Sequence, residues 1–146
     1  MRVSVIGGST VDEETYDLAV TVGRELAEAG HTVVCGGLSG VMEAACRGAH
    51  ETGGTTIGIL AGDDLDAANA YVDVPIATGL GSKRNALVVG NGEAAIAIDG
   101  SYGTLSEIAL ALDAGIPVVG LDTHDVDGIT RVDDATAAVE AVERLV

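Results

Sequence analysis

Three glycine-rich loops in this 146-residue chain could each bind an anion. They are Gly7–Ser9, Gly36–Gly40 and Gly100–Thr104, and each stands between an apolar run and a segment with helical spacing. Glycine lets backbone N–H groups approach an anion closely, and the N-terminus of a following helix adds partial positive charge. A tight strand-to-helix turn would explain any single loop equally well. Three such loops at one edge of a sheet favour a binding site for a phosphorylated ligand.

The residue order in these loops excludes the common dinucleotide and P-loop motifs. The fingerprint GxGxxG is absent after the first apolar run, and Cys35 stands where an acidic residue would end the second. The Walker pattern GxxxxGK[ST] is also absent. We therefore expect neither NAD nor another resident cofactor. The scattered Asp73, Asp122 and Asp125 predict no metal centre.

Two longer motifs resemble a known family. Residues 36–60, GGLSGVMEAACRGAHETGGTTIGIL, resemble the GGGxxGxMGxxAxGAxxxGG element of the Lonely Guy superfamily, often labelled lysine-decarboxylase-like. Residues 99–107, DGSYGTLSE, resemble its second signature, PGGxGTxxE, and Arg84 stands at the family's spacing before it. The resemblance extends from Val3 to about Leu121. It implies a Rossmann-like fold and cleavage of a nucleoside 5′-monophosphate into free base and ribose 5-phosphate.

The resemblance also implies that Arg84 and Glu107 form the catalytic pair. A carboxylate such as Glu107 could stabilise an oxocarbenium-like ribose or activate water at C1′. The guanidinium of Arg84 could bind the phosphate or orient Glu107. Each residue has a structural alternative. Glu107 follows Thr104 by three residues and could complete a capping box, and Arg84 could be an exposed helix charge.

Departures from the family's pattern favour a second function. Asp99 replaces the family's Pro, Ser101 replaces its second Gly, and Asn85 replaces the Lys that often follows the Arg. A carboxylate at Asp99 would repel a phosphate dianion unless Arg84 or a cation intervened. The chain thus resembles a divergent branch near the molybdenum cofactor carrier proteins, which bind a phosphorylated ligand without necessarily cleaving it. A non-catalytic carrier or sensor of a nucleotide or molybdopterin-type cofactor is the alternative to a phosphoribohydrolase.

Three further candidates carry two interpretations each. Lys83 could assist Arg84 or be solvated, Tyr102 could stack on a base or fill its loop, and Met42 could contact the ligand or belong to the core. Ser39 and Thr104 stand where a hydroxyl can cap a helix or contact a phosphate. The predicted binding residues are Gly8, Ser9, Gly36, Gly37, Ser39, Gly40, Met42, Lys83, Gly100, Ser101, Tyr102, Gly103 and Thr104.

These residues must be positioned by alternating strands and helices. The helical periodicity predicts helices over residues 12–29, 41–51, 82–89, 104–114 and 133–146. Apolar runs predict strands over residues 2–6, 31–35, 55–60, 71–76, 93–98 and 117–121, with a short strand near Ile129. We expect one domain over residues 1–146, of Rossmann-like, doubly wound α/β fold. Its mainly parallel sheet of six to seven strands would carry helices on both faces and the ligand at the carboxyl ends of the strands.

The amino-acid composition indicates which binding partners and which cellular compartment to expect. The chain has 23 Asp and Glu against seven Lys and Arg, a net charge of −16, so we expect no nucleic-acid partner. Apolar stretches are interrupted well short of about 18 residues, and Met1 leads directly into a strand. We expect no membrane span, no signal peptide and a cytoplasmic location. Cys35 and Cys46 fit buried thiols in a reducing compartment better than metal ligands.

The segment 104–114, TLSEIALALDA, is apolar on nearly all sides. A helix that packs only on its own sheet needs a single apolar stripe. The second apolar side could be covered by the final helix of the same chain or by a partner helix. Members of the resembled superfamily are dimers or larger, and we expect a homodimer.

The acidity predicts a strong dependence of stability on salt. Acidic residues spread along a chain with a single Lys, Lys83, are typical of the cytoplasmic proteins of extreme halophiles. Sixteen uncompensated negative charges repel one another at low ionic strength and are screened at high salt. We expect the melting temperature to rise steeply between dilute buffer and molar potassium chloride. A flat response would rule out the halophilic interpretation.

Overall fold

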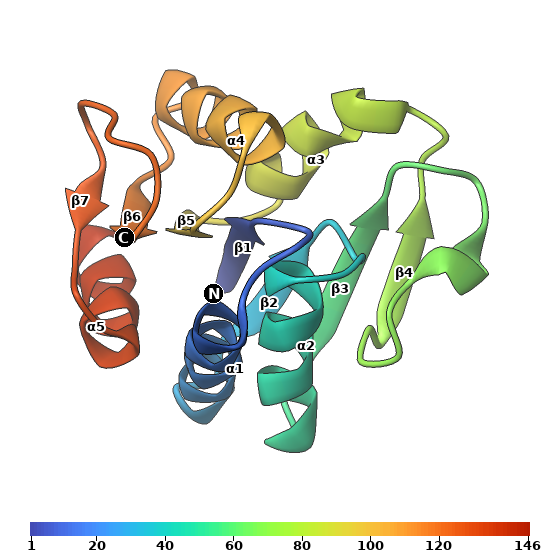
Figure 1. The fold of residues 1–146 in the computed structure, drawn as a ribbon, viewed down its shortest axis with the longest axis horizontal. Helices are drawn as coiled ribbons and strands as arrows, with labels where there is room; N and C mark the ends of the chain where they lie inside the picture. The colour runs from blue at the N-terminus through green and yellow to red at the C-terminus, as the bar shows by residue number, and fades with distance from the viewer.

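A computed structural model describes residues 1–146 and contains one seven-stranded sheet in which all neighbouring strands are parallel. The strands lie in the order β4-β3-β2-β1-β5-β6-β7 (Figure 1). The fold is therefore the predicted doubly wound α/β fold. The strands are β1 (Arg2–Gly7), β2 (Thr32–Cys35), β3 (Thr56–Leu60), β4 (Val74–Ala77), β5 (Ala94–Ile98), β6 (Val118–Leu121) and β7 (Thr130–Arg131).

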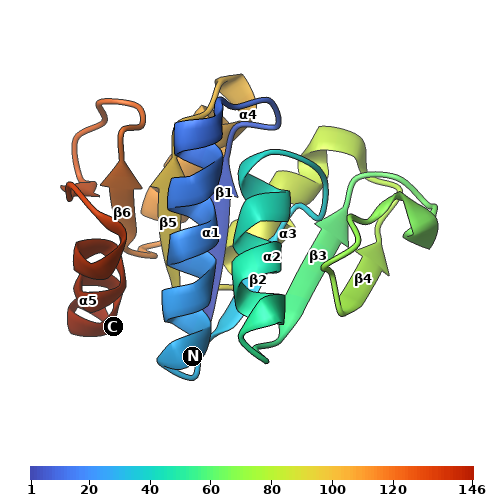
Figure 2. The same cartoon turned by 60° about the horizontal axis from the view of Figure 1, so that its bottom comes forward.

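Helices cover both faces of the sheet (Figure 2). Helices α1, α2 and α5 lie on one face, and α3 and α4 lie on the other. None of the helices combines the length and the apolar character needed to cross a bilayer. The helices are α1 (Glu13–Glu28), α2 (Val41–Glu51), α3 (Asn85–Gly90), α4 (Tyr102–Asp113) and α5 (Ala135–Leu145), with one-turn 3-10 helices η1 (Leu65–Ala67) and η2 (Gly81–Arg84).

Strand residues alternate between the two faces, as the pleat of a strand requires. In β1, Val3 and Val5 pack with α1, α2 and α5, whereas Ile6 packs with α3 and α4. All five residues of β5 are buried, and they divide between the same two cores. The central strands are therefore apolar on both faces, as expected for a parallel sheet covered by helices on each side.

The ends of several elements differ from the sequence prediction for local reasons. Asp12 and Asp134 cap α1 and α5: each accepts a 2.8 Å hydrogen bond from the backbone N–H three residues on, so neither is the first helical residue. Strand β4 begins at Val74 rather than at residue 71, because Asn69 Oδ1 accepts the N–H of Tyr71 in a turn. The predicted helix 82–89 divides into η2 and α3.

Helix α4 begins at Tyr102, two residues before the predicted start, and it lies on the face opposite α5. Helix α5 packs against α1 instead. The final helix of the chain therefore leaves the outer side of α4 uncovered, and the interpretation that it would cover that side is wrong. Leu110 of α4 is 40% exposed.

The chain reverses its direction across the sheet between the neighbouring strands β1 and β5. From β1 it proceeds through β2 and β3 to β4, and from β5 it proceeds through β6 to β7 on the other side. The loop after β1 leads to α1 on one face, and the loop after β5 leads to α4 on the other. The two loops therefore part at the carboxyl ends of the strands, which is where open α/β sheets bind ligands.

Candidate functional site

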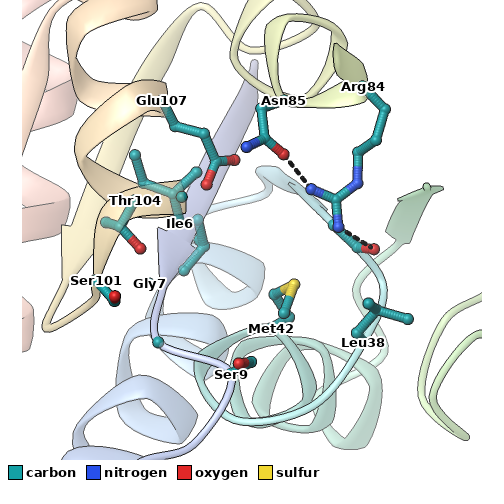
Figure 3. Close-up of a pocket in the computed structure, with 14 residues that line it drawn as sticks. Ile6, Gly7, Ser9, Leu38, Met42, Arg84, Asn85, Ser101, Thr104 and Glu107 are labelled. Carbon is teal, nitrogen blue, oxygen red and sulfur yellow. Dashed lines mark hydrogen bonds between the residues drawn. The ribbon is translucent and has the colours of Figure 1, made fainter. Parts of the chain in front are cut away.

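A cavity of about 250 Å³ opens at this reversal (Figure 3). Its walls come from all three glycine-rich loops, from the start of α4 and from the junction of η2 and α3. The lining residues are Val5, Ile6, Gly7, Gly8, Ser9, Gly36, Leu38, Met42, Arg84, Asn85, Ser101, Gly103, Thr104 and Glu107.

The structure brings together nine of the residues proposed from the sequence. They are Gly8, Ser9, Gly36, Met42, Arg84, Ser101, Gly103, Thr104 and Glu107. Gly37, Gly40 and Gly100 shape the loops without lining the cavity, and Ser39 lines a neighbouring hollow together with Leu38 and Asn69. Lys83 is exposed, and Tyr102 is 87% exposed at the mouth of the third loop.

Arg84 is buried in the cavity wall, where Glu107 is the one carboxylate among the lining residues. The side chain of Arg84 is 9% exposed and forms no salt bridge with any carboxylate. Nη1 donates to Asn85 Oδ1, Nη2 donates to the Gly36 carbonyl at 3.5 Å, and Nε is buried with no partner. The interpretation of Arg84 as an exposed helix charge is therefore wrong. A buried guanidinium that lacks a carboxylate is expensive unless an anion neutralises it.

Gly36 permits the close approach of this cation. A methyl group at Gly36 would lie 2.7 Å from Arg84 Nη2 and 2.7 Å from Met42 Sδ. Both of those atoms line the cavity, so any side chain at this position would displace the guanidinium. Gly36 thus leaves room for the flexible ends of the Arg84 and Met42 side chains in the cavity wall.

Glu107 faces the same cavity from α4 and is 7% exposed. Helix α4 begins before Thr104 and its first residue has no side-chain cap, so Thr104 and Glu107 do not form the capping box considered from the sequence. The carboxyl group of Glu107 makes no hydrogen bond with the protein. Burial raises the pKa of Glu107 to about 7, although the positive charge of Arg84 acts in the opposite direction. The carboxyl group is thus poised between its acid and base forms near neutral pH.

Asp99 lies outside the cavity, in contrast to the expected position beside a bound phosphate. The residue adopts a positive φ of 53°, and it lines a separate hollow with Asp12, Glu14 and Asp122 on the α1 side of Gly8. The loop that follows is held from the other side, because Thr123 Oγ1 donates to the Asp99 carbonyl at 2.7 Å. The Asp99 carboxylate nevertheless lies against the cavity wall, because a methyl group at Gly8 would be 2.9 Å from Asp99 Oδ2.

Five lining residues were not among the predicted binding residues, although Gly7 and Leu38 belong to two of the proposed loops. Val5, Ile6 and Gly7 belong to β1 and reach the cavity because the neighbouring loops part there. Leu38 lies in the second glycine-rich loop, and its sequence position does not show that it lines a cavity. Asn85 could have been found from its place directly after Arg84, but a run of helical spacing does not reveal that both of these side chains are buried.

The fold and the cavity define the class of protein. A doubly wound parallel sheet with glycine-rich loops around a buried arginine at its reversal point is a Rossmann-like domain of the nucleotide-binding type. All of residues 1–146 match the model of the SLOG cluster4 family, and the protein belongs to that family.

Two solved structures and one sequence relative show which proteins this chain is similar to within that fold. It is similar to the molybdenum cofactor binding protein of the phototrophic bacterium Rippkaea orientalis, with a TM-score of 0.93 and 30% identity, over 99% of this chain and 96% of that one. It is also similar to the molybdenum cofactor carrier protein of Chlamydomonas reinhardtii, with a TM-score of 0.91 and 35% identity over the same shares. An uncharacterised protein of Archaeoglobus fulgidus is 46% identical over 121 residues, which are 83% of this chain and 80% of that protein. The resemblance to the carrier branch is confirmed.

The raised pKa of Glu107 predicts a pH-dependent stability. Between pH 4.5, the ordinary pKa of a Glu, and about pH 7, the folded protein holds a proton that the unfolded chain releases. The free energy of unfolding should therefore fall as the pH rises through this window, by at most about 3 kcal/mol. Glu107→Gln keeps the hydrogen-bonding shape and cannot titrate, so it should lose this decline. Denaturant unfolding at constant ionic strength measures the difference.

Glu140→Gln is the matched control, since Glu140 is an exposed residue of α5. Its pH dependence should follow that of the wild type. Parallel curves for the wild type and Glu107→Gln would show that Glu107 is not desolvated in the folded protein.

Proposed function

We propose that this protein binds a phosphorylated ligand of the nucleotide or molybdopterin type and carries it without cleaving it. The observation that carries the proposal is the guanidinium of Arg84, which is buried in the wall of a glycine-lined cavity and forms no salt bridge. Protein interiors rarely keep such a charge without a partner. A phosphate group is the partner that its planar donors fit best.

Free backbone donors face Arg84 across the cavity. The first hydrogen bond within α4 runs from the N–H of Leu105 to the Ser101 carbonyl, so the N–H groups of Gly103 and Thr104 have no helical partner. Ser101 and Thr104 add hydroxyl groups on the same wall. A phosphate in the cavity would thus lie between a helix N-terminus and a cation, two features that both favour negative charge.

The comparisons favour a carrier over an enzyme. The similar solved proteins from Rippkaea orientalis and Chlamydomonas reinhardtii are described as binding or carrying the molybdenum cofactor. This chain matches each of them over nearly its whole length. No metal or resident cofactor is needed in this proposal, since the phosphorylated molecule is the cargo.

A second function, phosphoribohydrolase activity on a nucleoside 5′-monophosphate, is favoured by one observation. Arg84 and Glu107 line the same cavity, as the Lonely Guy resemblance implies for a catalytic pair. In such a reaction the ionised Glu107 would stabilise positive charge at C1′ or take a proton from water, while Arg84 would hold the phosphate. Glu107 would need to be deprotonated, so activity would rise with pH through about 7.

Binding and turnover measured together distinguish the two functions. We expect the molybdenum cofactor, AMP or both to raise the melting temperature of the wild-type protein, with no release of adenine. Arg84→Met should weaken that binding by about tenfold or more, because a charge-assisted contact is lost. Arg144→Met is the matched control, since Arg144 is an exposed cation of α5.

The carrier and the enzyme predict different results in this experiment. Adenine release from AMP that disappears in Glu107→Gln would establish the enzyme and remove the carrier proposal. A wild-type protein that binds neither the cofactor nor AMP, in molar potassium chloride as well as in dilute buffer, would remove both.

We also propose that the protein is a homodimer through the face that carries α3 and α4. Leu87 and Leu110 are each 40% exposed there. The apolar surface continues onto β4, where Val74 and Ile76 are paired in register with Ile57 and Ile59, residues of the core beneath α3 and α4. Exposed apolar residues on one face of a sheet and its helices are typical of interfaces.

A charge placed in this face should dissociate the dimer. Leu110→Asp would bury a carboxylate at the interface, and we expect its mass by light scattering in molar potassium chloride to fall to 14.5 kDa. Leu145→Asp is the matched control, because Leu145 is 42% exposed on α5 at the opposite face and should leave the dimer intact. A wild-type mass near 14.5 kDa at micromolar concentration would contradict the proposal.

A further inference from the structure

Asn85 and Arg84 are consecutive residues that both point into the cavity. Arg84 is 9% and Asn85 is 7% exposed, whereas Lys83 and Ala86 on either side are exposed. The chain changes from the 3-10 helix η2 to the α-helix α3 between them. Arg84 and Asn85 are therefore buried although they are adjacent along the chain, as are Val88 and Val89 one turn further on.

Both the oxygen and the nitrogen of the Asn85 side-chain amide form hydrogen bonds. Its Oδ1 accepts from Arg84 Nη1, and its Nδ2 donates to Ser106 Oγ at 3.3 Å. Ser106 Oγ in turn donates to the Gly103 carbonyl at 2.6 Å. A chain of hydrogen bonds thus joins the guanidinium to the first turn of α4; Figure 3 shows its first bond, from Arg84 to Asn85. The other nitrogen of the guanidinium, Nη2, is held by the Gly36 carbonyl.

The chemical type of residue 85 matters because an amide fixes the cation without neutralising it. A carboxylate at this position would pair with Arg84 and cancel its charge, and an ammonium group would repel it. The carbonyl oxygens of Asn85 and Gly36 hold the guanidinium from two directions and leave its full positive charge for a ligand. Preorganised charge of this kind binds an anion without first breaking an ion pair.

We propose that Asn85 is the positioning residue of the site: through Arg84 it sets the affinity for the anionic group of the ligand, and through Ser106 it links that group to the start of α4. This inference rests on the proposed function. The ligand group that it concerns is a tetrahedral dianion such as a phosphate monoester.

The test measures sulfate, a tetrahedral dianion that does not titrate near neutral pH, by calorimetry at constant ionic strength. Asn85→Asp is nearly isosteric, and we expect it to weaken sulfate binding by about tenfold or more because Arg84 is then neutralised. Asn91→Asp adds the same charge at the far end of α3 and should change the affinity by less than about twofold. Ser106→Ala alters only the exposed end of the chain of hydrogen bonds, so it should fold and should weaken binding by about two- to fivefold.

A spectroscopic measurement separates positioning from a general loss of structure. Nitrogen-15 NMR of the Arg84 side chain should show slowed rotation of the guanidinium in the wild type and free rotation in Asn85→Leu. The other backbone amide resonances should keep their wild-type positions.

Each outcome decides one question. Sulfate binding of wild-type strength in a folded Asn85→Asp, or in Ser106→Ala if Asn85→Asp does not fold, would overturn the role of Asn85 and leave the proposed function standing. A wild-type protein that binds neither sulfate nor phosphate would overturn the anion site itself, and with it both proposals.

Discussion

The reversal of chain direction between β1 and β5 is the constraint on which the site depends. These two strands are hydrogen-bonded neighbours at the centre of the sheet, so their carboxyl ends cannot separate. The helices that follow them must nevertheless cover opposite faces. In a parallel sheet the two loops must therefore part, and the cavity forms between them. Topology is therefore the first factor that decides which residues line this cavity, and side-chain chemistry is the second.

The cavity attracts anions, whereas the surface of the rest of the molecule repels them. The surface carries most of a net charge of −16 and repels anions at long range, whereas Arg84 and the start of α4 attract them at short range. Salt screens the surface charges over about 10 Å at 0.1 M but acts weakly inside the cavity. A dianionic ligand should consequently reach the cavity faster as the ionic strength rises, which is the reverse of the usual electrostatic steering. The raised pKa of Glu107 completes this arrangement, because a protonated carboxyl group adds no repulsion.

The fold could be predicted from the sequence almost completely, whereas only part of the site could. Apolar runs and helical spacing placed the strands and helices because each element has a strong local pattern, and glycine-rich loops marked the carboxyl ends of the strands. The resemblance to the Lonely Guy motifs singled out Arg84 and Glu107. Local spacing does not show that two consecutive residues of a helical run are both buried, so the burial of Asn85 was not foreseen. The direction of Asp99 depends on its positive φ, which the sequence does not specify for a residue that is not glycine.

The buried guanidinium also has a consequence for the lifetime of the protein. Without a ligand, Arg84 keeps two hydrogen bonds to the protein but has no salt bridge and an unpartnered Nε, so an anion that pairs with it stabilises the folded protein. Occupied molecules should therefore open less often than empty ones, since a ligand that binds only the folded state lowers the population of open states. Proteases act on those open states. In a cell, the abundance of such a protein would follow the supply of its ligand, with the empty copies degraded first.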